Sequence, residues 1–411
     1  MGNKVLSKIF KGDKWVWLCF GLLLGSSLMF VYSSTAMLSY KQYHGNTFHF
    51  LITQGLFIIG GVLVALITSN ISYKKLFNLA NAALGFGILL LLLTWMFGDA
   101  TNDAKRWLKI PIIDQTLQTS DIAKICLTIF IAKVMSTHQN NDEEIKKGAL
   151  ISALAMGVVF ILILPANLST ALLIVLTSVL MLIIARVKIK HILLVGSGAG
   201  LIALLLVISL GKTGTLKRAE TWVNRIEAYV FTGEEDAKTS QNNFQADQAK
   251  IAVARGGLFG QGISGSTQKY ILPHPYSDFM FATIIEEKGL IAGIFLIIVY
   301  MALMHRTVLT AKFQSRSFPA FLCIGLGLNI TLQAIANMVV SVNIVPVTGQ
   351  PLPLISMGGT SLIITSFSIG IILNISRYSD KEGKEKEKEE VEEQDREQNI
   401  EDISDYPFVI G

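Results

Sequence analysis

The chain has 411 residues, of which 51% are hydrophobic and only 16% are charged, and its mean hydropathy is +0.52. Soluble domains carry about 25% charged residues, so this composition excludes an ordinary soluble enzyme and indicates an integral membrane protein. The net charge of +5 is unevenly distributed, because residues 379–411 hold 13 acidic and 5 basic side chains. The preceding residues therefore carry +13.

Ten apolar runs are long enough to be predicted as transmembrane helices of about 20 residues. In chain order they cover 15–36, 48–69, 76–98, 120–137, 148–165, 168–185, 191–210, 279–304, 318–341 and 357–376. The predicted fold is thus an all-α polytopic membrane protein. It divides into a basic N-terminal segment (1–14), a ten-helix membrane domain (15–376) and a charged tail (377–411) that has too few apolar residues to fold alone.

Basic residues predict the orientation of these helices. With the N-terminus inside, the short inner segments hold 14 Lys and Arg, whereas the short outer loops hold 4. Because positive loops stay in the cytoplasm, we expect both termini inside and one large extracytoplasmic loop at about 211–278. The first apolar run is expected to be retained as a helix rather than cleaved as a signal.

Three carboxylates stand where that large loop meets the next apolar run. Asp278 lies at the junction, and Glu286 and Glu287 follow within roughly two to three helical turns. Ionisable groups at membrane depth are costly and are usually functional. The sequence therefore predicts a site at this junction.

The large loop also carries five cations that could bind a phosphorylated ligand. Arg218 and Arg225 are seven residues apart and share one face of a helix. They could bind a diphosphate bidentately or reach lipid phosphates as interfacial side chains, and the pattern leaves both open. Lys250, Arg255 and Lys269 flank a glycine-rich stretch whose backbone amides could approach a phosphate.

Two further outer stretches are polar. The first contains Arg106 and ends at Lys124, which is predicted to pair with Asp121 at i, i+3 on a helix. The second, 342–356, is rich in Pro and Gly, and irregular backbone at this depth must pack in protein or line a wet cavity. It is therefore predicted to form a wall of a pocket beside Asp278.

Six of these stretches, in order, resemble the SEDS family (shape, elongation, division and sporulation), which contains the FtsW, RodA and SpoVE peptidoglycan glycosyltransferases. They are RW…QTSDIAK (106–124), PANLST (165–170), the arginines 218 and 225, QAKIAVARGGLFGQG (248–262), LPHPYSDFMFATIIEEKGL (272–290) and PVTGQPLPLISMGGTS (346–361). The resemblance implies a ten-helix fold that polymerises lipid II, the undecaprenyl-diphosphate-linked disaccharide-peptide, on the outer face of the bacterial cytoplasmic membrane. It also implies that Asp278, in SDF where the family has TDF, is catalytic.

Strand synthesis requires a sugar hydroxyl to attack an anomeric carbon and expel a lipid diphosphate. One general base is needed, and cations rather than a second acid assist the leaving group. We hypothesise that Asp278 is this base and that inversion results. The candidate substrate-binding cations are Arg218, Arg225, Lys250, Arg255, Lys269, Arg106 and Lys124.

Supporting roles are expected for five other residues. Glu286 and Glu287 are predicted to connect helices by pairing with a base such as Lys124, and Ser356, Gly358 and Gly359 belong to the Pro/Gly-rich wall. No ligand cluster predicts a metal site, although a divalent cation such as Mg²⁺ or Mn²⁺ could assist at the diphosphate.

The resemblance implies a class B penicillin-binding protein, the transpeptidase, as a partner, together with other divisome proteins and no nucleic acid. The segment at 346–361 and the charged tail favour the FtsW-like division branch, and hence the division septum. Three other functions stay open, namely a flippase or transporter for lipid II, a non-catalytic division scaffold, and another membrane glycosyltransferase such as an outer-polysaccharide polymerase or ligase.

Overall fold

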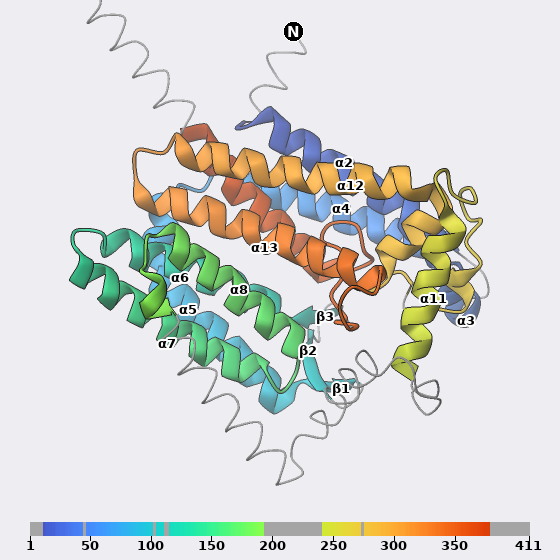
Figure 1. The fold of residues 1–411 in the computed structure, drawn as a ribbon, viewed down its shortest axis with the longest axis horizontal. Helices are drawn as coiled ribbons and strands as arrows, with labels where there is room; N and C mark the ends of the chain where they lie inside the picture. The colour runs from blue at the N-terminus through green and yellow to red at the C-terminus, as the bar shows by residue number, and fades with distance from the viewer. Residues whose placement is uncertain are drawn as a thin grey trace, which may run out of the picture.

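The computed structural model describes residues 11–43, 47–101, 104–110, 115–192, 241–272 and 275–378. Its long helices lie side by side with roughly aligned axes (Figure 1), and a large cluster of buried apolar side chains fills the space between them. Of the candidate site residues, Arg218 and Arg225 lie outside the described residues.

Seven helices in the described part are long and apolar enough to cross a membrane. They are α2 (Lys14–Ser34), α4 (Thr47–Ser69), α5 (Tyr73–Phe97), α7 (Asp142–Ile163), α12 (Met280–Lys312), α13 (Ser317–Ser341) and a final helix, Gly359–Tyr378. Two more predicted runs are also helical, as α6 (Thr119–Thr137) and the shorter α8 (Leu168–Ile184). The remaining predicted run, 191–210, lies outside the described residues except for 191–192.

Side-chain caps explain where several helices begin. Asp13 accepts a hydrogen bond from the Trp15 amide at 2.8 Å at the start of α2. Asn167 accepts one from the Thr170 amide at 3.3 Å at the start of α8. Such caps satisfy backbone donors that have no partner inside the helix.

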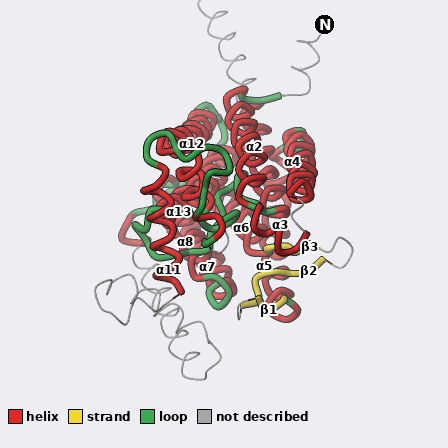
Figure 2. Tube along the Cα trace, turned by 90° about the vertical axis from the view of Figure 1, so that its right-hand side faces the viewer, coloured by secondary structure: helices red, strands yellow, loops and turns green. Residues whose placement is uncertain are grey.

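A small antiparallel sheet replaces the loop that the sequence predicted between α5 and α6. Its strands are β1 (Asp99–Thr101), β2 (Ala104–Ile110) and β3 (Gln115–Gln118), in the order β1-β2-β3. The prediction of an all-α fold was wrong here, because strands of three to seven residues give little periodic signal. The sheet lies at the end of the bundle where α6 and α8 begin (Figures 1 and 2).

Three short helices also lie outside the predicted spans: α3 (Ala36–Tyr43), α11 (Gln241–Gly256) and the 3₁₀ helix η2 (Gln268–Tyr270). We call the end of the bundle that carries the sheet and α11 the Asp278 end. The sequence predicts that this end faces outward.

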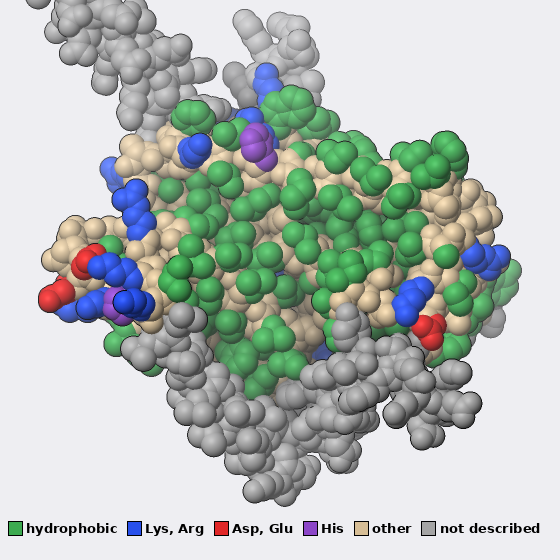
Figure 3. Space-filling view, in the orientation of Figure 1, with side chains coloured by type: hydrophobic (Ala, Val, Ile, Leu, Met, Phe, Trp, Pro, Cys, Tyr) green, Lys and Arg blue, Asp and Glu red, His purple; other side chains and the backbone are tan. Residues whose placement is uncertain are grey.

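Hydrophobic side chains cover the middle of the molecular face in Figure 3, and charged side chains gather towards the ends of the helices. On α4, exposed apolar side chains recur at helical spacing, at Ile52, Leu56, Ile59, Leu63 and Ile67. A surface that is apolar in the middle and charged at both ends matches the hydrocarbon core of a bilayer between two aqueous phases. The chain therefore has the surface of an integral membrane protein.

Helix α12 is broken at Gly289, which has φ 79° and ψ 178°. The glycine-rich stretch fills the break with backbone hydrogen bonds. The amides of Gln261 and Gly262 donate to the carbonyls of Glu286 and Glu287, both at 2.9 Å, and the Leu290 amide donates to a carbonyl of the same stretch at 2.9 Å. Two of the amides suggested by the sequence as a phosphate cradle thus bind the protein's own carbonyl groups.

Candidate active site

Asp278 lies in the turn that leads into α12, and its side chain is half-buried. Ser277 Oγ donates to Asp278 Oδ1 at 2.9 Å. The Asp278 carbonyl accepts from the side-chain amide of Asn337 on α13 at 2.9 Å. The same amide of Asn337 also donates to the Gln350 carbonyl at 2.7 Å, so one side chain joins α13, the Asp278 turn and the Pro/Gly-rich segment.

The Pro/Gly-rich segment holds the Asp278 turn from a second side. Ser356 Oγ lies 2.9 Å from the Ser277 carbonyl, and the Met357 amide donates to the Tyr276 carbonyl at 2.9 Å. Burial, and then the Asp278 carboxylate, raise the pKa of the Tyr276 hydroxyl, so this hydroxyl stays neutral near pH 7. These contacts place the Pro/Gly-rich segment against the Asp278 turn.

Arg106 on β2 approaches Asp278 at Gly349. A Cβ atom at position 349 would lie 3.5 Å from Asp278 Oδ2 and 4.0 Å from Arg106 Nη1. Gly349 has φ +66°, a conformation that glycine adopts readily. The guanidinium is oriented by a 2.7 Å hydrogen bond from Arg106 Nε to the Ala166 carbonyl at the entry to α8. The sheet therefore brings a cation to the predicted general base.

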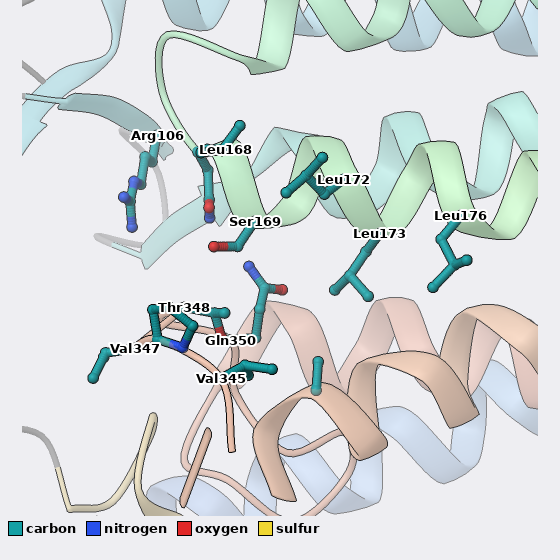
Figure 4. Close-up of a pocket in the computed structure, with 13 residues that line it drawn as sticks. Arg106, Leu168, Ser169, Leu172, Leu173, Leu176, Val345, Val347, Thr348 and Gln350 are labelled. Atoms are coloured by element: carbon teal, nitrogen blue, oxygen red, sulfur yellow. The ribbon is translucent and has the colours of Figure 1, made fainter. Parts of the chain in front are cut away.

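A cavity of about 360 Å³ lies beside Arg106, between α8 and the segment 345–350 (Figure 4). This volume is within the usual range for ligand pockets, about 300–1,000 Å³. Its polar lining residues include Arg106, Asn167, Ser169 and Gln350, and its walls are mainly apolar, from Leu168, Leu172, Leu173, Leu176, Ala336, Val345, Pro346 and Val347. Such a lining suits a ligand with an apolar chain and a polar head.

Two polar groups of this cavity differ in their bonding. Gln350 Nε2 donates to Thr170 Oγ1 at 2.8 Å and so connects the two walls. The hydroxyl of Thr348, which also lines the cavity, is buried and has no hydrogen-bond partner among the described residues. A buried hydroxyl without a partner is costly, and a polar ligand atom would satisfy it.

Lys250 and Arg255 lie on the exposed surface of α11. Lys250 pairs with Asp247 at 3.3 Å, and Arg255 donates to the hydroxyl of Thr267. Among the described residues, the structure thus places Arg106 beside Asp278 and the α11 cations on a separate element at the Asp278 end. Their predicted role in substrate binding, like that of Arg218 and Arg225, stays a prediction.

Lys269 and Lys124 have protein partners. Lys269 is only 1% exposed and pairs with Glu287 at 3.5 Å, which argues against direct contact with a ligand. Lys124 pairs with Asp121 at 3.6 Å, so the predicted i, i+3 pair is confirmed. Lys124 also donates to Gln333 Oε1 at 2.7 Å. The expectation that Glu286 or Glu287 pairs with a base is confirmed for Glu287, but the base is Lys269, which the fold brings to it, and Lys124 pairs with Asp121 instead.

Glu286 is completely buried. Its carboxylate accepts hydrogen bonds from the amides of Thr267 at 3.1 Å and Gln268 at 3.3 Å, and from the hydroxyl of Ser266.

Gly359 begins the final helix, where a Cβ atom would lie 2.4 Å from the ring of Phe57 on α4.

Gly358 directly precedes this helix, and a Cβ atom there would lie 2.6 Å from Ser361 Oγ. Gly358 and Gly359 thus allow close packing at the start of the final helix.

Two residues of the site were not among the predicted ones: Asn337, which binds the Asp278 turn, and Gln333, which binds Lys124. A signal for them exists, because Asn329, Gln333 and Asn337 recur every four residues along an otherwise apolar span. Polar side chains on one face of a span usually point to the protein interior. In the described part of the chain, no group of three or more His, Cys, Asp or Glu side chains is placed to hold a metal ion.

The family of cell cycle proteins named for FtsW, RodA and SpoVE matches residues 13–381. The chain belongs to the FtsW/RodA/SpoVE family. Two of its relatives carry the name probable peptidoglycan glycosyltransferase FtsW. The one from Coxiella burnetii is 30% identical over 89% of this chain and 96% of its own length. The one from Geobacter sulfurreducens is 31% identical over 87% of this chain and 91% of its own length.

Another family member, stage V sporulation protein E of Bacillus subtilis, is 30% identical over 87% of this chain and 95% of its own length. Solved structures show the same fold. A chain from a peptidoglycan synthase complex that coordinates polymerization and crosslinking has a TM-score of 0.68, with 22% identity over 90% of this chain and 98% of that one. Rod shape determining protein RodA of Thermus thermophilus has a TM-score of 0.62, with 20% identity over 89% of this chain and 97% of that one.

Proposed function

We propose that this member of the FtsW/RodA/SpoVE family polymerises glycan strands from lipid II on the outer face of the bacterial cytoplasmic membrane, with Asp278 as the general base. One observation carries the proposal. Asp278 Oδ2 and Arg106 Nη1 both lie within 4.0 Å of the position of a Cβ atom at Gly349, and Arg106 also lines the leucine-rich cavity. A base, a cation and an apolar pocket are the parts that a lipid-diphosphate donor requires.

In this mechanism the Asp278 carboxylate removes the proton of the acceptor hydroxyl as it attacks the anomeric carbon. The bond to the lipid diphosphate breaks, and the configuration inverts. General base catalysis of this kind contributes about 10²–10⁴-fold. The diphosphate leaves as a stable anion, so stabilisation by cations is needed more than protonation.

Arg106 is the described cation best placed to meet the diphosphate. Its Nε is bound to the Ala166 carbonyl, and the planar fork of a guanidinium matches the geometry of a phosphate. Lys250 and Arg255 on α11, and Arg218 and Arg225 outside the described residues, are proposed to add positive charge along the large loop.

The leucine-lined cavity is proposed to hold the first part of the undecaprenyl chain. Burying apolar surface contributes about 25 cal/mol per Å², so this wall would supply binding energy without contributing to the chemistry. The hydroxyl of Thr348 and the amide of Gln350 would contact the polar head. The names of the relatives support this substrate class.

A class B penicillin-binding protein is the proposed partner, and the division septum, with its other divisome proteins, is the proposed location. The structural neighbour that coordinates polymerization and crosslinking supports a cross-linking partner. A fluorescent fusion expressed with the cognate transpeptidase tests both points. Distribution over the whole envelope would contradict the septal location.

The decisive experiment compares wild type with the Asp278→Asn variant in nanodiscs that contain the cognate partner and labelled lipid II. We expect Asp278→Asn to lower kcat by about 10²–10⁴-fold while lipid II binding persists. Asp142→Asn, at an exposed aspartate at the opposite end of the molecule, is the matched control. Polymer formation by Asp278→Asn at the wild-type rate would exclude the general-base role.

Two additions to this assay test the alternatives. Treatment with EDTA followed by Mg²⁺ or Mn²⁺ tests whether a divalent cation assists at the diphosphate. Vesicles that score translocation of lipid II separately from polymerisation test the transporter function. Translocation without polymer would replace the polymerase proposal.

A further inference from the structure

A buried polar cluster lies at the Asp278 end, apart from the proposed catalytic groups. Its members are Ser33 on α2, Lys269 on η2 and Glu287 on α12. Lys269 Nζ lies 3.5 Å from Glu287 Oε1 and 3.1 Å from Ser33 Oγ, and Ser33 also donates to Glu287. The side chains of Lys269 and Glu287 are each 1% exposed. We call these three residues the outer cluster.

Stability alone is a weak explanation for this cluster. Removing two charges from water is costly, and a buried ion pair often contributes no more than packed apolar side chains of the same volume. In the outer cluster the cost is higher still, because Glu287 Oε2 is buried without a hydrogen-bond partner among the described residues. Buried ion pairs can instead specify one arrangement of the elements that they join.

The arrangement that the outer cluster specifies is that of the catalytic turn. Lys269 precedes Asp278 by nine residues, and Glu287 follows it by nine. Their ion pair therefore closes a segment of chain with Asp278 at its centre. Glu286, the neighbour of Glu287, closes the same segment again through the amides of Thr267 and Gln268.

The break in α12 explains why a contact at this end is needed. A second ion pair joins α2 and α12 at the opposite end, where Asp13 Oδ2 lies 2.7 Å from Arg306 Nε and 2.5 Å from Nη2. Gly289 interrupts the helix between Arg306 and Asp278. Because the helical conformation is interrupted at Gly289, the Asp13–Arg306 pair does not by itself set the position of the half of α12 that follows Asp278.

We propose that Ser33, Lys269 and Glu287 are positioning residues that hold this half of α12 against α2 and so place the Asp278 carboxylate for proton removal. The inference rests on the proposed function of Asp278. Ser33 and Lys269 then contribute to catalysis by holding Asp278 in place. Lys269 does not contact the substrate.

The test uses the full chain in nanodiscs with its cognate partner. The variants are Ser33→Ala, Glu287→Gln and the charge-exchanged double variant Lys269→Glu with Glu287→Lys. Arg306→Met is the matched control, because it breaks the other ion pair between the same two helices. The readouts are kcat and KM for lipid II, the thermal midpoint, and hydrogen–deuterium exchange of the peptide 275–288.

We expect Glu287→Gln to lower kcat by about tenfold to a hundredfold, as a displacement of about 1 Å does, with KM changed less than about twofold. Ser33→Ala, which keeps the ion pair, should have a smaller effect in the same direction, and the double variant should recover part of the lost kcat. Exchange in 275–288 should rise in Glu287→Gln but not in Arg306→Met.

Two results would overturn the inference. One is a Glu287→Gln variant whose kcat and exchange match those of Arg306→Met at equal thermal midpoint. The other is a Ser33→Ala variant whose hydrogen–deuterium exchange in 275–288 equals that of wild type. This second result tests the inference even if Glu287→Gln does not fold. If the wild type makes no polymer, the proposed function fails, while the exchange measurement still tests the outer cluster.

Discussion

The break in α12 gives a prediction whose size follows from the structure. Gly289 has φ 79° and ψ 178°, a region that is essentially restricted to glycine and costs other residues about 1–3 kcal/mol. A Cβ atom there would also lie 2.1 Å from the Leu258 carbonyl oxygen and 2.4 Å from its carbon. Because these are backbone atoms, they cannot rotate away, and overpacking adds about 1–3 kcal/mol. Gly289→Ala should therefore destabilise the fold by about 2–6 kcal/mol.

Gly262 is the matched control. It also has a positive φ, +92°, but a Cβ atom there would meet nothing within 4 Å. Gly262→Ala should cost only the backbone strain, about 1–2 kcal/mol. Thermal melting in detergent, followed by size-exclusion chromatography, compares the two variants with wild type. We expect the lowest midpoint for Gly289→Ala, together with reduced polymerisation because the Asp278 half of the helix shifts. Equal thermal midpoints for the two variants would contradict the close contact between Gly289 and the Leu258 backbone.

Three more outcomes follow from the site. Leu173→Trp should fill the cavity beside α8 and lower kcat/KM for lipid II more than tenfold, or about 1.4 kcal/mol, with little change in midpoint; unchanged kinetics would exclude the cavity from the substrate path. Ser356→Ala removes the acceptor of the Leu352 amide and should lower the free energy of unfolding by about 1–3 kcal/mol. Its control, Ser361→Ala, loses only the local hydrogen bond to the Gly358 carbonyl and should lower this free energy less. Arg106→Lys keeps the charge but not the planar guanidinium, and it should reduce polymerisation at low lipid II concentration; wild-type rates would assign the diphosphate to other cations.

The sequence predicted where helices form better than it predicted what lies between them. Apolar runs of about 20 residues are selected by the thickness of the bilayer, and nine of the ten predicted runs coincide with described helices. The sheet at Asp99–Gln118 escaped prediction because β2 is stabilised by pairing with strands on both sides, not by its own pattern. The prediction of Asp278 as the key carboxylate rested on its place at the loop–helix junction, and the structure puts Arg106 beside it.

The membrane class, the runs that become helices and the i, i+3 pair of Lys124 with Asp121 could all be predicted before the fold was known, because they depend on neighbours along the chain. The tertiary structure alone decided that Glu287 pairs with Lys269 and Ser33. That choice depends on the break at Gly289 and on how the glycine-rich stretch enters it. A buried charged side chain pairs with whichever opposite charge the packing places within about 4 Å of it. For Glu287 this partner is Lys269, which the spacing along the sequence did not indicate.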